Sequence, residues 1–248
     1  MEWRDEGLII GVRRHGEAST IVEALTRAHG RHLGLVRGGR SDRLRATLQL
    51  GNTIGLVWRA RLDEHLGSYA VEPLSLRAGR LMGSALALAG INYVSALVRV
   101  LPERDPHEAV YEAISLIADA LHDGALAPTL IARFEAQILA ECGFQLDLSC
   151  CAATGVTDDL VYVSPKSGRA VSAEAGAPWR DRLLPLPPFL REDAPLQAQP
   201  SAEEIADGFR LTGFFLARDL FALHGEPLPD SRAAFLKAAA QAGRAKAQ

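Results

Sequence analysis

The 248-residue sequence has few of the side chains that build metal centres and disulfide frameworks. It holds three cysteines, Cys142, Cys150 and Cys151, and two of them are adjacent. A structural zinc site needs four ligands, usually as two close pairs, and no second cysteine or histidine pair follows between residues 155 and 200. Adjacent cysteines rarely bond to each other. Reduced, buried thiols in a cytoplasmic protein are therefore the simpler prediction.

Long apolar runs are also scarce. Four of the first six residues are charged, unlike the start of a signal peptide. The eighteen residues from Leu81 to Val98 are uncharged, which is about the minimum length of a membrane span, but they include Ser84, Asn92 and Ser95. We therefore predict a buried central helix at this position and no membrane association.

Catalytic patterns are missing as well. The seven histidines are scattered, and the sequence contains no HExxH, GxSxG or GxxxxGK[ST]. His15 with Glu17, or Asp158 with Asp159, could form acid and base pairs, but such pairs are mostly polar surface residues. We predict no catalytic residue, no cofactor, no bound metal and no enzymatic activity.

Positive charge, in contrast, is concentrated in one segment. Residues 11–61 hold ten arginines, no lysine and three acidic residues, whereas the whole chain has a net charge of −3. Arginine makes up 24 of the 27 basic residues of the chain, so the choice of arginine over lysine carries no information. The local excess of positive charge is informative, because a basic domain in an acidic protein usually binds a polyanion, most often nucleic acid.

We predict that nucleic acid contacts arginines of this basic segment. The loop from Arg37 to Arg45 is its most specific part, because it combines four arginines with Gly38 and Gly39, which allow close backbone approach. Guanidinium groups bind phosphate in a bidentate manner and also stack on bases. The alternative is that these arginines only cover solvated strand faces. The predicted contact residues are Arg13, Arg14, Arg31, Arg37, Arg40, Arg43, Arg45, Arg59 and Arg61.

Aromatic residues are few in and around this segment. Trp3, Trp58 and Tyr69 are the ones available for stacking on bases. Electrostatic contact with the phosphate backbone should therefore outweigh stacking, and sequence preference should be weak.

The first 76 residues alternate short β-type runs with turns. The runs are rich in Ile, Val, Leu and Thr, and glycine or acidic pairs separate them. Five short strands in so short a segment favour a small closed barrel over βαβ units. The predicted strands are Gly7–Arg13, Ser19–Thr26, Arg31–Arg37, Leu48–Arg61 and Leu66–Glu72.

After Pro73 the pattern becomes helical. Asp105 and Glu108 predict a capping box, with Pro106 in the first turn, and Ser201 and Glu204 predict a second one. Residues 144–200 hold seven of the thirteen prolines and are expected to be irregular. The predicted helices are 81–101, 105–122, 128–142, 201–224 and one from 231 that frays over 241–248.

The helices suggest a second binding surface. Their apolar residues mostly predict a bundle core, but a shallow apolar groove beside an arginine could receive an acidic peptide with a hydrophobic tip. The candidates for gripping such a peptide are Arg99, Arg133, Arg210 and Arg218, with Arg104 as a further possibility.

Several segments resemble those of the bacterial RecO recombination-mediator family. That family shows R-x-x-G-E-x-[SD], T-x-x-x-G-[RK] and [KR]-G-[AG]-[RK] in this order, and the present sequence has them at 13–19, 26–31 and 37–40. Single motifs are weak, but their order and spacing make the resemblance specific, and it covers nearly the whole chain. Further matches are Tyr93, Leu101–Glu103, Phe134–Phe144, Asp147–Leu148 and Ser164–Gly168.

The resemblance implies an α+β fold, with a five-stranded OB-fold barrel (1–77) followed by an α-helical domain (78–248). A small zinc-ribbon-like insertion is expected at 147–181. It also implies binding of single- and double-stranded DNA, of RecR and of the acidic C-terminal tail of single-stranded DNA-binding protein (SSB). Annealing of complementary strands and assistance to RecA loading, near the nucleoid in the cytoplasm, are the implied activities. The alternative is a protein-binding scaffold of the repair machinery with little DNA affinity.

The insertion departs from the family pattern. Many members carry C-x-x-C twice here, and the corresponding positions are Cys151 and Thr154, then Ser172 and Ala175. One thiolate of four remains, so we expect a degenerate, metal-free ribbon. An apolar substitute would come from Val161, Val163, Val171 and Trp179.

Overall fold

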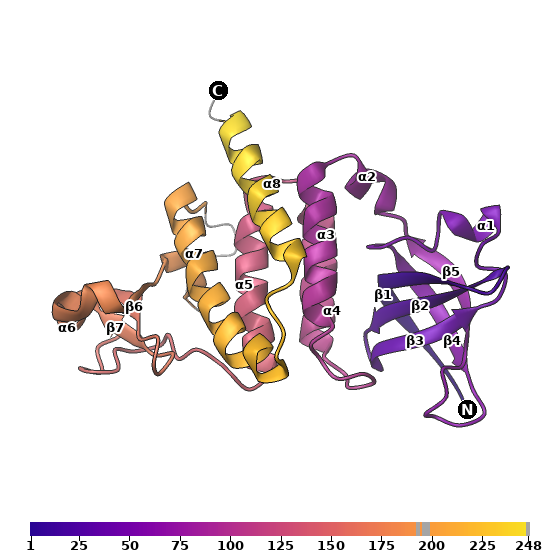
Figure 1. Cartoon of the computed structure of the whole chain (residues 1–248), viewed down its shortest axis with the longest axis horizontal. Coiled ribbons are helices and arrows are strands. Elements are labelled where there is room, and N and C mark those ends of the chain that lie inside the picture. The colour runs from indigo at the N-terminus through magenta and orange to yellow at the C-terminus, as the bar shows by residue number, and fades with distance from the viewer. Residues whose placement is uncertain (192–193, 195–198, 247–248) are drawn as a thin grey trace. The chain divides into compact units, whose positions relative to one another are not determined.

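A computed structural model describes residues 1–191, 194 and 199–246. The chain divides into two compact units, of which unit 1 comprises 1–122 and 231–238 and unit 2 comprises 123–230 and 239–248. The fold is α+β, with five strands at the start and a helical region after them, as predicted (Figure 1). The predicted domain bounds, 1–77 and 78–248 with the insertion at 147–181, remain predictions.

The strands of unit 1 form a closed barrel in the order β1-β2-β3-β5-β4. β1 pairs with β4 along its first half and with β2 along its second half, and a bulge between Ile9 and Gly11 bends it between the two partners. Ile9, Val22 and Trp58 point inward and are fully buried in the core. The strands are β1 (Glu2–His15), β2 (Ser19–Thr26), β3 (Gly30–Val36), β4 (Thr53–Arg59) and β5 (Ser68–Ser75).

Four of the five strands differ from their predicted extents: β3 is shifted by one residue, β5 runs over Ser68–Ser75 instead of 66–72, and β1 and β4 differ more. β1 begins at Glu2 rather than at residue 7, because its charged start pairs with β4, where Glu2 and Arg59 form an ion pair at 2.7 Å. The run predicted from Leu48 to Arg61 is a strand only from Thr53, since Leu48 packs into the core from the preceding loop. That loop contains the short helix α1 (Asp42–Arg45), which the sequence did not predict.

The helices of unit 1 begin at other residues than predicted. The expected helix over 81–101 is two helices, α2 (Ala78–Met82) and α3 (Ala85–Val98), because the Ser84 hydroxyl caps α3 by accepting the Ala87 N–H at 3.2 Å. The capping box predicted at Asp105 is wrong. α4 (Glu108–Ala120) begins three residues later, and His107 precedes it without a side-chain cap.

The uncharged segment is a core helix, as predicted. Val94, Leu97 and Val98 of α3 have no exposed surface, and Tyr93 stacks on Phe235 with ring centroids 6.3 Å apart. Among the described residues, no helix combines the length and the apolar character needed to cross a membrane.

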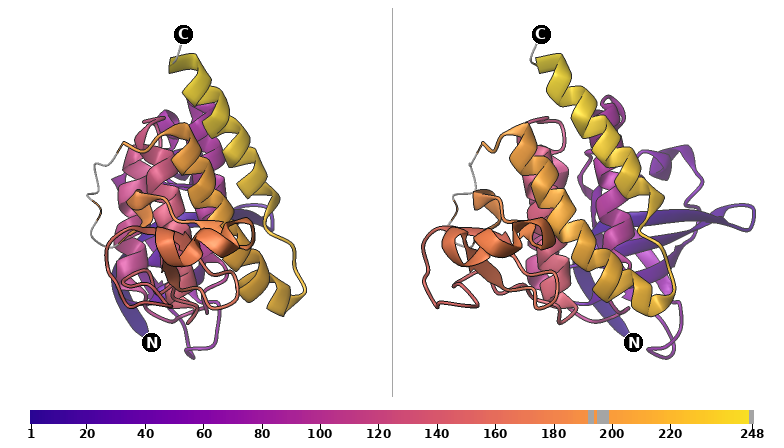
Figure 2. Two further views of the ribbon diagram at one scale, coloured as in Figure 1. Left: turned by 90° about the vertical axis from the view of Figure 1, so that its left-hand side faces the viewer. Right: turned by 60° about the vertical axis from the view of Figure 1, so that its left-hand side comes forward.

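Unit 2 is built on two helices that lie side by side, α5 (Leu126–Glu141) and α7 (Ala202–Phe215) (Figure 2). The buried Thr212 hydroxyl of α7 donates to the buried Glu135 carboxylate of α5. The capping box of Ser201 and Glu204 is confirmed. Helical turns continue through Leu216–Phe221, in π form, and Ala222–His224.

The last helix, α8 (Asp230–Lys246), belongs in part to each unit. Fraying was predicted from residue 241, but the helix continues to Lys246, so that prediction is wrong for 241–246. Residues 247–248 lie outside the described residues. Alanines and long basic side chains are good helix formers, which explains the extension.

The region expected to be irregular holds a small three-stranded sheet in the order β7-β6-β8. Its Cys151 sulfur accepts hydrogen bonds from the Ser172 N–H at 3.3 Å and the Ser172 hydroxyl at 3.5 Å. Two of the four positions that correspond to the family's C-x-x-C cysteines therefore lie together. Val163 and Val171 are buried, but Trp179 is 57% exposed, so its predicted packing role is wrong. The elements are β6 (Leu160–Val163), β7 (Ala170–Ser172), α6 (Ala173–Gly176), β8 (Leu184–Pro185) and 3-10 turns at Ala177–Arg182 and Pro188–Leu190.

Candidate nucleic-acid interface

The arginine-rich loop after β3 is fastened to the barrel by its small and apolar residues. Leu44 and Leu48 pack on the barrel core. Gly39 lies so close to β2 that a Cβ at this position would come within 2.8 Å of the Thr20 side chain. The Arg40 N–H donates to the Ala18 carbonyl in the β1–β2 turn at 3.2 Å. The loop is therefore anchored next to that turn, with its arginines outward.

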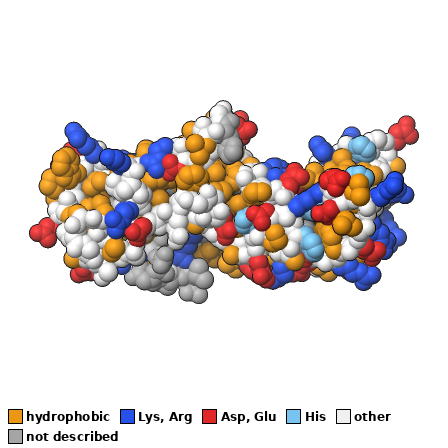
Figure 3. Space-filling model, turned by 90° about the horizontal axis from the view of Figure 1, so that it is seen from below, with side chains coloured by type: hydrophobic (Ala, Val, Ile, Leu, Met, Phe, Trp, Pro, Cys, Tyr) orange, Lys and Arg blue, Asp and Glu red, His pale blue; other side chains and the backbone are white. Residues whose placement is uncertain are grey.

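Strand register brings the arginines of two segments to one edge of the barrel. Arg14 pairs with Thr20 across β1 and β2, and Thr20 pairs with Val36 across β2 and β3. The end of β1 and the start of the loop at Arg37 therefore flank the same residue. Lys and Arg side chains gather at the barrel, on the right of Figure 3. We call the exposed residues Arg13, Arg14, Arg37, Arg40, Arg43 and Arg45 the arginine edge.

Most guanidinium groups of the arginine edge keep their charge available. Within the described part of the chain, no carboxylate pairs with Arg13, Arg14, Arg37 or Arg43. Arg40 donates to the Glu17 backbone carbonyl at 2.6 Å, which fixes its position without cancelling its charge. The remaining member, Arg45, lies 3.4 Å from Asp42, and both side chains are largely exposed, so this pair is weak.

A groove of about 580 Å³ adjoins the arginine edge. Arg37 and Arg43 line it together with Arg59 of β4 and Tyr69 of β5. Arg59 holds the pKa of its ion-pair partner Glu2 below the usual range, through a hydrogen bond and its charge. Arg61 follows in the exposed β4–β5 loop, and no described carboxylate pairs with it.

Arg31, in contrast, is largely buried, and its charge is paired with carboxylates. Its side chain is only 14% exposed and pairs with Glu23 at 2.8 Å and with Glu103 at 3.4 Å. Its Nε also donates to the Leu101 carbonyl at 3.2 Å. These contacts fasten β3 to the segment that follows α3, so the geometry favours a structural role for Arg31 over contact with phosphate.

The arginines proposed to grip a peptide are divided between the two units. In unit 1, Arg99 pairs with Glu23 at 2.9 Å, and Arg104 donates to the carbonyls of Asp63 and His65. In unit 2, Arg133 donates to the Phe189 carbonyl at 2.8 Å, and burial lowers its pKa. Arg218 pairs with Asp219 and lies over the rings of Phe214 and Phe215. Arg210 is exposed, and no described carboxylate pairs with it.

Sequence reasoning missed the residue that holds the end of the loop. Asn52 is fully buried, and its Nδ2 donates to the carbonyls of Ala46 and Thr47, both at 2.9 Å. Its Oδ1 accepts the N–H groups of Arg77 at 2.8 Å and Ala78 at 2.9 Å. One side chain thus joins the segment after α1 to the start of α2. The sequence signal was only an asparagine after a glycine, which is typical of any turn.

The acid and base pairs considered from the sequence lie on the surface. His15 and Glu17 are exposed at the β1–β2 turn, and Asp158 and Asp159 are exposed before β6. In the part of the chain that the structure describes, His, Cys, Asp and Glu nowhere gather in a group of three or more that could hold a metal ion.

Comparison with known proteins agrees with these features. Residues 1–77 match the family described as "Recombination protein O N terminal", and residues 82–228 match "Recombination protein O C terminal". The DNA repair protein RecO of Methylocella silvestris is 62% identical over 95% of either chain. The RecO proteins of Beijerinckia indica, 59% identical over 95% of this chain and 94% of that protein, and of Mesorhizobium japonicum, 58% over 96% and 93%, are also similar. The role of the protein lies in DNA repair and recombination, and the chain belongs to the RecO family.

Proposed function

We propose that the protein is a recombinational repair mediator that binds single- and double-stranded DNA through the arginine edge. It anneals complementary strands and, with RecR, assists RecA loading on DNA coated by SSB. The activity is binding without a covalent step, and it takes place in the cytoplasm. The observation that carries this proposal is the set of exposed arginines, five of the six without a described carboxylate partner, along one edge of the barrel.

The mechanism is neutralisation of phosphate charge. Two DNA strands repel each other, and arginines that contact both backbones lower this repulsion while the bases pair. Each contact releases condensed counterions, so affinity depends steeply on salt. If about six phosphates are neutralised, affinity should fall roughly a thousandfold between 50 and 200 mM salt.

Partner binding is assigned to surfaces outside the arginine edge. The acidic tail of SSB needs an available cation beside apolar side chains. Arg210 meets the first condition best among the candidates, because Arg99, Arg133 and Arg218 are already engaged. These arginines, and also Arg31 and Arg59, already bond other groups of the chain and are less available to a ligand. This observation favours the alternative function, a scaffold with little DNA affinity.

The test is binding of a fluorescently labelled single-stranded oligonucleotide, measured by anisotropy across a salt series. The Arg37→Ala/Arg40→Ala/Arg43→Ala variant removes three charges from the arginine edge. We expect a steep dependence of affinity on salt for the wild type and a slope smaller by about two to three phosphate contacts for the variant.

A charge-matched control removes three exposed cations from unit 2, Lys166, Arg180 and Arg182, by substitution with alanine. This control should keep the wild-type slope. Equal slopes for the wild type and the arginine-edge variant would place the DNA elsewhere. Absence of binding by the wild type at low salt would leave the scaffold as the better function.

A further inference from the structure

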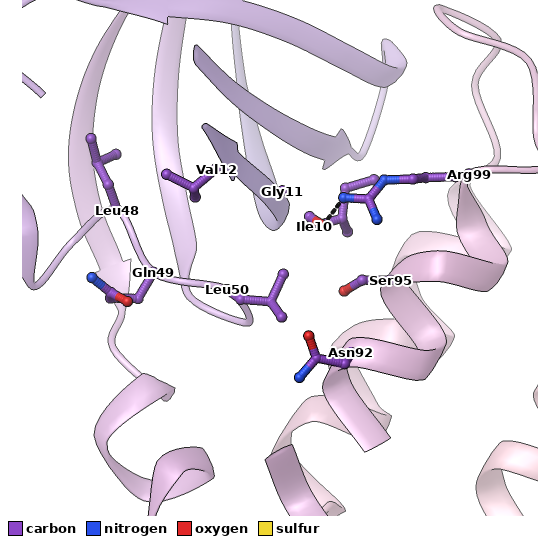
Figure 4. A pocket seen from close by; sticks show the side chains of 9 residues that line it. All are labelled: Ile10, Gly11, Val12, Leu48, Gln49, Leu50, Asn92, Ser95 and Arg99. Atoms are coloured by element: carbon purple, nitrogen blue, oxygen red, sulfur yellow. Dashed lines mark hydrogen bonds between the residues drawn. The ribbon is translucent and has the colours of Figure 1, made fainter. Parts of the chain in front are cut away.

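A second hollow lies between the barrel and α3, in unit 1. It has a volume of about 380 Å³, within the range of roughly 300–1,000 Å³ found for small-molecule sites. Ile10, Gly11 and Val12 of β1 form one side, the loop at Leu48–Leu50 forms a second, and α3 forms the third (Figure 4). We call it the α3 pocket.

The walls of the α3 pocket differ in chemistry. Opposite the helix lie the aliphatic side chains of Val12, on β1, and Leu50, in the loop, whereas Ile10 has no exposed surface. The helix side presents Asn92 and Ser95 of α3 and Arg99, the residue directly after α3, and their spacing of three and four residues places them on one side. Figure 4 shows the side chains of Asn92 and Ser95 directed from the helix toward Leu50. Such a pocket fits a flat group with an apolar face and a polar edge.

The charge in the pocket is already compensated. The Arg99 guanidinium pairs with Glu23 at 2.9 Å and donates to the Ile10 carbonyl at 2.5 Å. An anionic ligand would have to displace Glu23 from Arg99 or lie close to its carboxylate. A neutral polar ligand is therefore favoured over a phosphate or a carboxylate.

Three oxygens in the pocket accept no hydrogen bond from the part of the chain that the structure describes. The Ser95 hydroxyl is buried, with 1% of the residue exposed, and no described group bonds to it. The amide nitrogen of Asn92 donates to the Leu88 carbonyl at 2.7 Å, which leaves its Oδ1 to accept. The amide nitrogen of Gln49 donates to the Arg45 carbonyl at 2.6 Å and leaves its Oε1 in the same way. The pocket thus calls for a ligand that donates hydrogen bonds.

The α3 pocket lies near one member of the arginine edge, Arg13. A smaller hollow of about 170 Å³ shares Gly11, Val12 and Arg99 with it and is also lined by Arg13. A strand whose phosphates contact Arg13 would therefore pass the mouth of the pocket.

We infer that the α3 pocket receives one unstacked nucleobase of a bound single strand and favours a base with an exocyclic amino group, such as cytosine, over thymine. This inference rests on the proposed DNA binding. The amino group donates to Asn92 Oδ1 or Gln49 Oε1, whose amide nitrogens are already engaged, and the ring packs on Val12 and Leu50. Thymine has an oxygen where cytosine has the amino group, so it meets these two acceptors with repulsion, whereas the Ser95 hydroxyl can donate as well as accept and does not discriminate between the bases.

The test compares the affinity for oligo(dC) and oligo(dT) of equal length, by anisotropy, in slightly alkaline buffer at one low salt concentration. We expect the wild type to bind oligo(dC) about fivefold more tightly, as one neutral hydrogen bond allows. Asn92→Leu and Gln49→Leu should bring the ratio close to one and leave the salt slope unchanged. Asn92 is exposed and the side-chain hydrogen bond of Gln49 lies at the surface, so both variants should melt at or near the wild-type temperature.

Gln145→Ala, an exposed glutamine of unit 2, is the matched control and should keep the wild-type ratio. A wild-type ratio of one, or a ratio that neither variant changes, overturns the inference while the salt slope still supports DNA binding. No binding of either oligonucleotide overturns the proposed function and the inference together.

Discussion

At the scale of single residues, two arginines of the predicted contact set show how surroundings decide what a guanidinium group does. Arg31 is largely buried and serves two carboxylates, whereas Arg43 is exposed on α1 without a described carboxylate partner. Replacement of Arg31 leaves Glu23 and Glu103 without this partner and breaks the contact to Leu101. Replacement of Arg43 removes one exposed positive charge and breaks no described ion pair.

We therefore expect Arg31→Ala to lower the free energy of unfolding by about 2 kcal/mol, the scale of hydrogen bonds to a charged group. Arg43→Ala should change it by less than about 0.5 kcal/mol but weaken DNA binding at low salt. Urea unfolding and anisotropy, both measured on each variant, separate the two effects. Equal stability of the two variants would contradict the structural role of Arg31.

His32 supplies a pH dependence of stability. It is 2% exposed on β3, lies edge-on to Trp58, and its Nδ1 is 3.2 Å from the Tyr69 hydroxyl. Burial lowers the pKa of His32 from its ordinary value of 6.5, and the charge of the nearby Arg104 lowers it further. The folded protein thus binds this proton less readily than the unfolded chain does. Its contribution to stability is complete above the unfolded pKa and is lost as pH falls through the lower folded pKa.

The free energy of unfolding of the wild type should therefore fall from about pH 7 to about pH 5. His32→Phe keeps an aromatic ring at this site but cannot titrate, so its loss over the same range should be smaller. His65→Ala, at an exposed histidine, should follow the wild type. Unfolding in urea at both pH values measures the difference, and parallel behaviour of wild type and His32→Phe would refute the assignment.

At the scale of elements, the arginine-rich loop depends on one close approach. A Cβ at Gly39 would meet Thr20 at 2.8 Å and Leu48 at 3.1 Å, whereas one at Gly38 meets nothing within 4 Å. Gly38 has a φ of +66°, so a substitution there strains the backbone without a clash.

We expect Gly39→Val to displace the loop and weaken DNA binding about tenfold, with a loss of about 1–3 kcal/mol in stability from overpacking. Gly38→Ala should cost about 1–2 kcal/mol from the left-handed backbone alone and change DNA affinity little. Anisotropy and thermal melting report the two quantities. If both variants lost affinity equally, the close packing at Gly39 would not be what positions the arginines.

In the ribbon, Cys151 contacts two of the other three positions that correspond to the family's cysteines, Thr154 and Ser172. Burial alone would raise the pKa of the Cys151 thiol, but its hydrogen bonds to Ser172 and Thr154 together lower it to about 6. The variant Thr154→Cys/Ser172→Cys/Ala175→Cys should therefore bind one zinc ion per chain and melt at a higher temperature with zinc than without.

Zinc content and melting temperature test this prediction. The same three substitutions combined with Cys151→Ala are the control, because they leave one ligand too few for a closed tetrahedral site. A triple variant that binds no more zinc than this control would show that the four positions do not surround one point.

At the scale of the whole molecule, charge is separated between the basic segment and the rest of the chain. Residues 11–61 carry an excess of seven positive charges in a protein whose net charge is −3. On the proposed function, DNA is therefore attracted to one region and repelled by the remainder. If the same arginines neutralise about six phosphates in either form of DNA, the slopes of log affinity against log salt should be about −5.4 for duplex and −4.2 for single strands.

Anisotropy with matched single- and double-stranded oligonucleotides measures both slopes. A duplex slope shallower than the single-strand slope would mean that the two forms use different surfaces. The arginine-edge variant should flatten both slopes together, whereas the control variant in unit 2 should flatten neither.

Predictions from the sequence were correct where the structure depends on contacts within one short stretch of chain. β2 has its predicted bounds, Ser19–Thr26, because turn residues flank it on both sides. The Ser201 capping box formed as predicted, since both of its hydrogen bonds close within four residues. The box at Asp105 did not form. There the backbone conformation is set by contacts with β3, because the Arg104 N–H donates to the Arg31 carbonyl and Gly30 packs against Asp105.

The sequence by itself therefore determined the α+β class, the position of the basic segment and membership of the RecO family, because these depend on composition, order and spacing. Only the tertiary structure decided which arginines form ion pairs with carboxylates. Arg31 meets Glu103, and Arg99 meets Glu23 from 76 residues away, through folding of the barrel against its helices. Such ion pairs join positions far apart in the chain. Their presence or absence, which sets the charge left for a partner, is a property of packing.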